Sequence, residues 1–350
     1  KVQKLFLPKK SKYYFYYKTL FDYRFPKKTT RKKAINIISS FFIKNNNVLN
    51  LKFEKNTYTL VKDSLKKFLE YLLISEKIKN KKLNFSDCSL MNCVYAGLYI
   101  INNKNFSKTI HKINKVFKLD GEVISSSLEN YKLSAIRENG QYLSRESEIV
   151  EKRSNVRIKN IYLMNEYLDK KTVNGIVSKK RLEYLEQSNS KLISNYEANK
   201  KLKKANIIIY APGTQHSSLY PTYILSGIGD SIAKNKGAIK FFITNIGADY
   251  ETPSYIASEY ILGALNYINR YSLKKNYKIN DFFNYNFVNL NKKNIKNFVK
   301  IDKNNLKKIE TETIYGKFSL NETTGKHDGK KIIKKLLELY YKIKWKYSLL

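Results

Sequence analysis

A run of three isoleucines followed by Tyr210 and an Ala-Pro-Gly turn constrains this chain more than any other feature. The apolar run from Ile207 to Tyr210 is typical of a strand buried in a parallel sheet, and Pro212 and Gly213 end it. Hydroxyl and amide side chains follow before the next apolar run. Because an open α/β sheet binds its ligands beyond the carboxyl ends of the strands, this turn is the first candidate for a binding site.

The turn carries groups that suit phosphate or sugar oxygens. Gly213 has no side chain, so a bound group can approach its backbone closely. The hydroxyls of Thr214, Ser217 and Ser218 can form hydrogen bonds beside the backbone N–H groups. An ordinary strand-to-helix turn, in which the serines only cap the helix, explains the same residues. The spacing leaves both interpretations open.

The segments that follow alternate between strand and helix. We expect a helix near 223–233, a buried strand at 239–244 with Asn245 after it, and a helix over 253–268. This order predicts an α/β fold that is Rossmann-like and doubly wound, with a mainly parallel sheet and helices on both faces. Strand-like runs on either side of Asn139-Gly140 add a short β-hairpin.

An apolar segment further upstream, residues 85–99, predicts a buried helix with Ser86 or Asp87 as its N-cap. Ser89 and Asn92 lie near its start, and buried polar side chains need hydrogen-bond partners. A ligand could supply these partners, and so could neighbouring backbone.

The two cysteines, Cys88 and Cys93, are expected on different sides of this helix. So few cysteines favour a reduced, cytoplasmic protein. No apolar run reaches the roughly 18 residues that a spanning helix needs, and no secretory signal follows Lys1. We therefore expect no membrane partner.

The formal net charge of +38 in 350 residues invites a nucleic-acid interpretation, with 29 Tyr and 18 Phe available for base stacking. However, arginine, the side chain best matched to phosphate, supplies only 8 of the 67 basic residues. The lysines occur in nearly every segment and favour a solvated surface. Nucleic acid is therefore the less favoured partner.

Motif searches exclude several kinds of site. Leu320 and His327 stand where a P-loop needs glycine and Ser/Thr, and Gly227-Ile-Gly229 lacks the third glycine of a dinucleotide fingerprint. The three histidines and two cysteines have no zinc-site spacing, and no Ser-His-acid arrangement is favoured. The sequence therefore assigns no catalytic residue and no metal ligand.

Short motifs along the chain, taken in order, resemble those of one family. They are Leu20 to Phe25 (Leu-Phe-x-Tyr-Arg-Phe), Ser89-x-x-Asn92, Gly121 to Glu129, Tyr210 to Ile228 and His327-Asp328. The family is that of CofD and YvcK, the 2-phospho-L-lactate transferases and the related gluconeogenesis factors. The resemblance extends best over about residues 85–275, which makes this the expected α/β core. Residues 1–84 then form an N-terminal part and 276–350 a C-terminal extension.

The resemblance implies a Rossmann-like fold with a ligand cleft at the strand ends. The cleft residues that it implies are Ser89, Asn92, Pro212, Gly213, Thr214, Ser217, Ser218 and Asn245. In the transferases, a divalent metal assists transfer of a phospholactyl group from a nucleotide-activated donor to a deazaflavin. In the gluconeogenesis factors, the same cleft binds a nucleotide sugar, with no established catalysis.

We therefore expect a CofD-like transferase that is assisted by Mg²⁺ and binds a nucleotide-linked small molecule. A non-catalytic nucleotide-sugar regulator is the alternative, and a basic nucleic-acid binder is the third. Met91 and Ala211 replace glycines of the family pattern, and the family's glycine-rich and acidic N-terminal segment does not precede Lys1. The Mg²⁺ ligands are thus expected upstream of Lys1, and a homodimer is left open.

Overall fold

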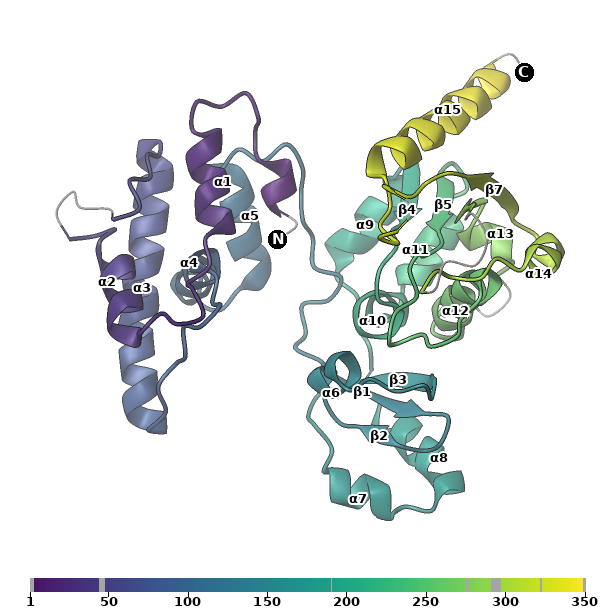
Figure 1. Cartoon of the computed structure of the whole chain (residues 1–350), viewed down its shortest axis with the longest axis horizontal. Helices are drawn as coiled ribbons and strands as arrows, with labels where there is room; N and C mark the ends of the chain where they lie inside the picture. Colours follow the sequence, from purple (N-terminus) through teal and green to yellow (C-terminus); the bar gives the residue numbers. More distant parts are fainter. Residues whose placement is uncertain are drawn as a thin grey trace. The chain divides into compact units, whose positions relative to one another are not determined.

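The chain is described here from a computed structural model, which covers residues 3–43, 48–189, 191–274, 277–290, 297–321 and 323–348. The chain forms two compact units, Lys1–Ser125 and Ser126–Leu350 (Figure 1). The helix expected to begin the α/β core belongs to the first unit. The divisions at 84 and 275, which came from composition and resemblance, stay predictions.

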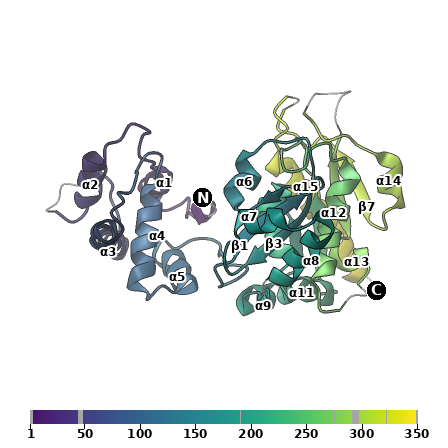
Figure 2. The same ribbon diagram turned by 90° about the horizontal axis from the view of Figure 1, so that it is seen from below.

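Unit 1 is helical. Its elements are η1 (Gln3–Phe6), α1 (Tyr14–Asp22), α2 (Arg31–Ser39), α3 (Lys55–Lys79), α4 (Leu90–Ile101) and α5 (Phe106–Val116). Leu65, Leu69 and Leu72 of α3 are buried at a spacing of three and four, as in an amphipathic helix. Helix α4 packs against α1, α3 and α5 (Figure 2). At Gly97, α4 approaches α3 so closely that an added Cβ would lie 1.7 Å from the Ser64 carbonyl oxygen.

Helix α4 begins later than the sequence suggested. Ser89 is its N-cap, whereas Asp87 lies before the helix with a φ of 56°. The main chain of Ser89 pairs with Arg24 in an antiparallel bridge, and this contact places the helix start. Cys88 therefore precedes the helix, and the prediction that Cys88 and Cys93 lie on different sides of it is wrong. Both thiols lie 3.7 Å from the Ser89 carbonyl oxygen.

Unit 2 contains a four-stranded parallel sheet in the order β4 (Ile207–Tyr210), β5 (Ile239–Ile243), β6 (Tyr285–Asn289) and β7 (Glu312–Gly316). The parallel pairing of the first two strands was predicted and is confirmed. Ile209, however, is 41% exposed, because β4 is at the edge of this sheet. Three successive isoleucines therefore do not mark a strand buried on both faces here.

The two faces of the sheet pack into different cores. Phe241 and Ile243 of β5 contact α15 (Gly329–Ser348) through Ile332 and Leu336. Phe242, between them, points the other way, toward the core formed with α10 (Tyr220–Tyr223) and α12 (Ala257–Arg270). Helices thus cover both faces, which confirms the predicted doubly wound α/β fold (Figure 1).

A small antiparallel sheet, in the order β2-β1-β3, lies beside this core. It consists of β1 (Lys132–Arg137), β2 (Tyr142–Leu143) and β3 (Ile158–Met164). Gly140 has a φ of 82°, as expected for the Asn-Gly hairpin turn. The predicted β-hairpin is confirmed.

The other elements of unit 2 are short. They are α6 (Glu146–Glu151), α7 (Lys170–Gly175), α8 (Ser178–Ser188), α9 (Tyr196–Lys204), η2 (Gln215–Leu219), α11 (Ile228–Lys234), α13 (Ile279–Phe282) and α14 (Lys303–Lys308). The prediction of a single helix near 223–233 is wrong. A π-helix, η2, runs into α10, and Gly227 with a φ of 91° then separates α10 from α11.

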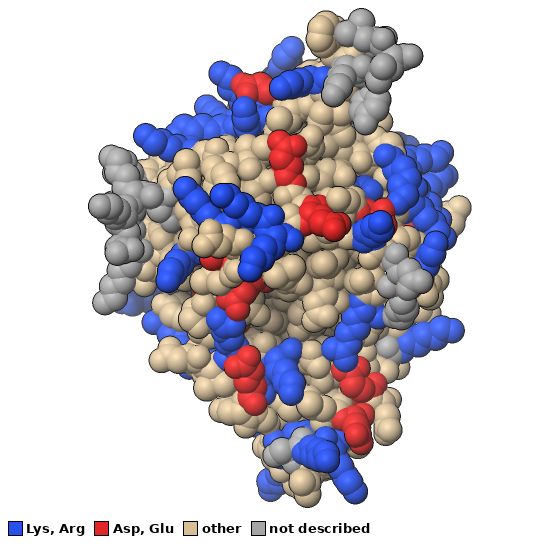
Figure 3. All heavy atoms as spheres, turned by 90° about the vertical axis from the view of Figure 1, so that its right-hand side faces the viewer, with Lys and Arg blue, Asp and Glu red and all other residues tan. Residues whose placement is uncertain are grey.

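One face of the molecule carries charges of both signs. On the face in Figure 3, Lys and Arg are spread over the surface with Asp and Glu between them. Within the described part of the chain, no helix has both the length and the apolar character needed to cross a bilayer.

Candidate functional site

The turn after β4 and Asn245, two residues after β5, meet at one edge of the sheet, because parallel neighbours end on the same side. The Asn245 side chain accepts a hydrogen bond from the Gly213 N–H at 3.1 Å. Its amide group donates to the Gly213 carbonyl oxygen at 2.9 Å. Asn245 thus satisfies both backbone groups of Gly213 and fixes the conformation of the turn.

Three predicted hydroxyls form one cluster at the start of η2. The hydroxyl oxygens of Thr214 and Ser218 are 2.6 Å apart, and those of Ser217 and Thr214 are 3.2 Å apart. Ser218 is exposed, whereas Thr214 and Ser217 are half-buried. The cluster therefore offers hydroxyl groups to solvent beside the Gly213 backbone. Pro212 directly precedes this glycine and is half-buried as well.

Two carboxylates that the sequence did not single out complete this edge. Glu251, 3% exposed, accepts the Ser217 N–H at 2.8 Å and also the Ser217 hydroxyl. Burial is the main cause that raises the pKa of Glu251, and the Ser217 hydrogen bonds oppose it. Asp249 accepts the backbone N–H groups of Glu251 and Thr252 at 2.8 and 3.0 Å. A carboxylate of the chain itself therefore occupies the start of η2.

A buried histidine lies directly beneath the cluster. His216 is 1% exposed, and its ring packs edge-to-face with Tyr220 and Tyr267 at centroid distances of 5.0 and 6.2 Å. Burial, helped by the positive charge of Arg137, lowers the pKa of His216 to about 3. Nδ1 has no hydrogen-bond partner among the described residues. His216 is therefore neutral at pH 7 and acts as a core side chain.

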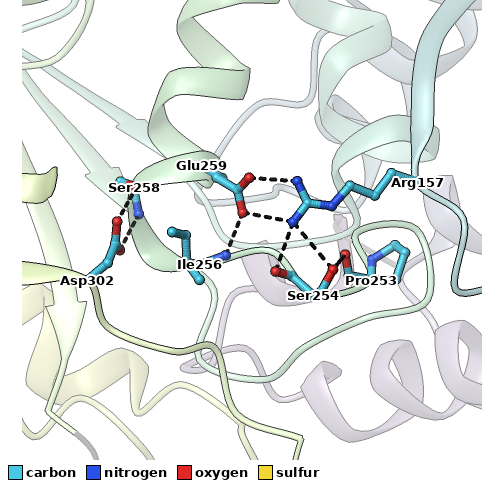
Figure 4. Close-up of polar contacts among 7 residues, drawn as sticks. All are labelled: Arg157, Pro253, Ser254, Ile256, Ser258, Glu259 and Asp302. Atoms are coloured by element: carbon cyan, nitrogen blue, oxygen red, sulfur yellow. Dashed lines mark hydrogen bonds and ion pairs between the residues drawn. The ribbon is translucent and has the colours of Figure 1, made fainter. Parts of the chain in front are cut away.

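An ion pair holds the far end of the segment that carries Asn245 and Glu251 (Figure 4). Arg157, next to β3, binds both carboxylate oxygens of Glu259 at 2.6 and 3.2 Å and donates to the Ser254 carbonyl oxygen at 3.0 Å. Glu259 also accepts the Ile256 N–H at 2.9 Å, which fixes the start of α12. Asp302 accepts the Ser258 N–H at 3.0 Å.

The C-terminal part of the chain contacts the same segment. His327 Nε2 lies 3.0 Å from the carbonyl oxygen of Thr244, the residue before Asn245. An added Cβ on Gly325 would lie 3.0 Å from the Gly247 Cα, so the two backbones touch. Residues far along the sequence therefore support the loop after β5.

The other two predicted ligand residues, Ser89 and Asn92, lie in unit 1. Both line a cavity of about 470 Å³, together with Arg24 and Tyr95. Ser89 is 6% exposed. Asn92 is exposed, so the expectation that it needs a buried hydrogen-bond partner is wrong. The six remaining predicted residues all belong to unit 2, where the turn, the hydroxyl cluster and Asn245 come together.

The Mg²⁺ implied by the resemblance can be tested against the carboxylates of this edge. One oxygen of Asp249 accepts two backbone N–H groups, and both oxygens of Glu251 are bound to Ser217. The described part of the chain contains no group of three or more His, Cys, Asp or Glu side chains that could hold a metal. These residues do not fit Mg²⁺, and we assign no metal ligand.

Curated relatives are similar to about half of this chain. The gluconeogenesis factor of Bacillus subtilis is 25% identical over 185 residues, which are 52% of this chain and 49% of the relative. That of Halalkalibacterium halodurans is 25% identical over 180 residues, 51% of this chain and 47% of the relative. The chain spans less than half the length of the curated relatives it matches, from 35% to 49%.

A solved structure supports the fold. The crystal structure of a UPF0052-family protein from Bacillus halodurans matches with a TM-score of 0.56 at 21% identity, over 81% of both chains. The family model described as 2-phospho-L-lactate transferase CofD matches residues 5–319. The match includes the parallel sheet, the hydroxyl-rich turn after β4 and Asn245 beside that turn. The chain therefore belongs to the CofD family.

Proposed function

We propose that this chain binds a nucleotide-linked small molecule at the carboxyl edge of β4 and β5, as a non-catalytic regulator of the gluconeogenesis-factor type. The paired hydrogen bonds between Asn245 and Gly213 carry the proposal. They hold the turn rigid before any ligand arrives, so less conformational entropy is lost when a ligand binds. The curated relatives are named gluconeogenesis factors, and these names support a regulator rather than a transferase.

The hydroxyl cluster suggests how the ligand is held. Ser217 is engaged by Glu251, so its N–H and hydroxyl are already used. Thr214 and Ser218 share one hydrogen bond, and Ser218 is exposed. These two hydroxyls can turn toward a phosphate or sugar oxygen without breaking the contact with Glu251. The backbone of Gly213 allows the ligand to come close.

A transferase is the second candidate, because the matching family model takes its name from one. Here a nucleotide-activated phospholactyl donor would occupy the same edge, and a deazaflavin would accept the group with Mg²⁺ present. The two candidates share the binding step and differ in turnover. A nucleic-acid binder stays the third prediction, with a steep salt dependence as its signature.

Calorimetric titration tests the binding step. The full chain is titrated with nucleotide sugars and with guanine nucleotides, with and without Mg²⁺. The key variant is Gly213→Val, with Gly213→Ala as its matched control. An added Cβ would meet only the Leu219 side chain, 3.9 Å away, so both variants should fold. We expect Gly213→Val to abolish binding and Gly213→Ala to weaken it less, because the branched side chain blocks the ligand.

The serines provide a second comparison. Ser218→Ala removes a hydroxyl proposed to face the ligand and should weaken binding roughly ten- to a hundredfold. Equal affinities of Gly213→Val and the unmodified chain would reject the site. Release of the nucleotide from a phospholactyl donor in the presence of a deazaflavin and Mg²⁺ would replace the regulator with the transferase. Binding to random single-stranded DNA that weakens steeply with salt would favour the third prediction.

A further inference from the structure

Cys88 and Cys93 lie at two positions that the start of a helix brings together. Ser89 is the N-cap of α4, so Cys88 stands one residue before the cap and Cys93 is the fourth helical residue. Side chains at these two positions commonly pack against each other. Both sulfur atoms lie 3.7 Å from the same Ser89 carbonyl oxygen. The fold thus places the only two cysteines of the chain side by side.

The two thiols have different surroundings. Cys88 is half-buried, whereas Cys93 is 1% exposed. A hydrogen bond from Cys93 and the nearby charge of Arg24 together lower the pKa of Cys88 to about 7, against burial and the negative charge of Asp87, which raise it. The hydrogen bond with Cys88 and burial both raise the pKa of Cys93. Cys88 therefore carries the accessible thiolate, and Cys93 keeps its proton beside it.

The main chain holds Cys88 beside Arg24. The Phe25 N–H donates to the Cys88 carbonyl oxygen at 2.9 Å, and the Leu90 N–H donates to that of Tyr23 at 3.1 Å. The Arg24 guanidinium binds Asp87 at 2.8 Å through its side chain and at 2.6 Å through its carbonyl oxygen. A positive charge thus stays close to the Cys88 sulfur, as in reactive cysteine sites.

We propose that Cys88 and Cys93 are a reversible dithiol–disulfide pair that reacts with small disulfides of the oxidised-glutathione class. The Cys88 thiolate attacks one sulfur of the disulfide, forms a mixed disulfide and releases one glutathione thiolate. That thiolate takes the proton of Cys93, whose sulfur then attacks Cys88 and releases the second glutathione. Counted from the Cys88 thiolate, the protein loses two electrons and the Cys93 proton. The second glutathione thiolate takes its proton from water, so one oxidised glutathione becomes two reduced molecules.

Oxidation would change a segment that lines a cavity. The new bond would span Ser89, which lines the 470 Å³ cavity of unit 1 together with Arg24. It would also remove the thiolate beside the Arg24 guanidinium. The test below measures only the two thiols, so its outcome is read separately from that of the ligand titrations.

Intact-protein mass spectrometry after exposure to oxidised glutathione tests the proposal. The unmodified chain should lose the mass of two hydrogens, retain no glutathione and resist alkylation until it is reduced. Cys93→Ser should keep one glutathione on Cys88, because no second thiol can release it. Cys88→Ser should remain unmodified, because Cys93 is buried. Circular dichroism checks that each variant is folded, and Cys93→Ala replaces Cys93→Ser if serine is not tolerated.

The rate gives a further readout. Alkylation of Cys88 should rise with pH with a midpoint of about 7, and Arg24→Gln should move this midpoint upward. At pH 7, Cys88 should react about threefold faster than free glutathione, because its larger thiolate fraction outweighs its lower nucleophilicity. A stable glutathione adduct on the unmodified chain would overturn the pair. So would equal reactivity of Cys88→Ser and Cys93→Ser.

Discussion

The Glu251 carboxylate accepts both the backbone N–H and the hydroxyl of Ser217, a residue 34 positions earlier in the chain. It thereby holds the first turn of η2 against the loop after β5. The contact is buried, so both the charge and the hydrogen bonds of Glu251 affect stability.

Replacing Glu251 should separate these two effects. In Glu251→Gln, the amide can still accept the Ser217 N–H and can donate to its hydroxyl, so little stability should be lost at pH 7. Glu251→Ala leaves the half-buried N–H without its partner and should cost about 1 to 3 kcal/mol. The free energy of unfolding in urea distinguishes the variants. Equal losses in the two would mean that the hydrogen bonds that glutamine keeps contribute little.

The pH dependence of Glu251 has a definite sign. Because burial raises its folded pKa above the ordinary value of 4.5, the folded state binds the proton more tightly than the unfolded state. Its contribution to stability is therefore largest below pH 4.5 and falls as the pH rises through the folded pKa. Glu251→Gln should remove this fall, as unfolding in urea at several pH values would show. An unchanged slope in the variant would contradict the assignment.

Asn245→Leu should loosen the turn after β4. The Gly213 N–H loses its partner, and the Gly213 carbonyl oxygen keeps only the hydrogen bond from the Gln215 side chain, which we expect to cost about 1 to 3 kcal/mol. Hydrogen exchange at the Gly213 amide should accelerate, and affinity for a nucleotide-linked ligand should fall. Ser218→Ala is the control, since it changes the ligand surface and leaves Gly213 bonded. Unchanged exchange at Gly213 would show that the turn holds its shape alone.

His216 should make unit 2 sensitive to mild acid. Its folded pKa of about 3 lies below the ordinary 6.5, so the unfolded state takes up the proton first as the pH falls. Between pH 7 and 5.5 this should remove about 1 kcal/mol of stability. His216→Phe keeps an aromatic ring against Tyr220 and should reduce the loss by that amount. Identical pH profiles in urea unfolding would count against a buried neutral histidine.

Gly97→Ala should disrupt unit 1. The new Cβ would lie 1.7 Å from the Ser64 carbonyl oxygen, and that backbone cannot move without shifting α3. We expect a loss of at least about 3 kcal/mol. Gly175→Ala is the matched control, because nothing lies within 4 Å of its added Cβ. Thermal unfolding followed by circular dichroism compares the two, and similar melting temperatures would disprove the close approach of α3 and α4.

The parallel sheet could be predicted because apolar runs of strand length, separated by a helix-length segment, indicate neighbouring parallel strands. Residues 239–244 and 207–210 carried that signal, and Asn245 followed from its position after a strand. The start of α4 could not be predicted in the same way. Ser86, Asp87 and Ser89 are all good N-cap residues, and the bridge between Ser89 and Arg24 decides among them. That contact joins residues 65 positions apart, which local patterns do not report.

Glu251 was missed for a similar reason. The loop from 245 to 256 has no apolar period, and the role of Glu251 depends on Ser217. One signal was present, since Asp249 and Glu251 are two carboxylates closely following Asn245 at a strand end in a chain with few acids. The position of β4 at the edge of the sheet could not be predicted either, because strand order within a sheet depends on contacts between distant residues.

The contact between His327 and the Thr244 carbonyl oxygen spans 83 residues. During synthesis, β4, β5 and the turn after β4 emerge well before His327 and Gly325 exist. The loop that carries Asn245 and Glu251 therefore lacks part of its support until Gly325 and His327 have been synthesised. A chain that ends before residue 320 also lacks α15, so one face of the sheet is uncovered and the binding edge lacks its support, which makes the ligand site one of the last features to form.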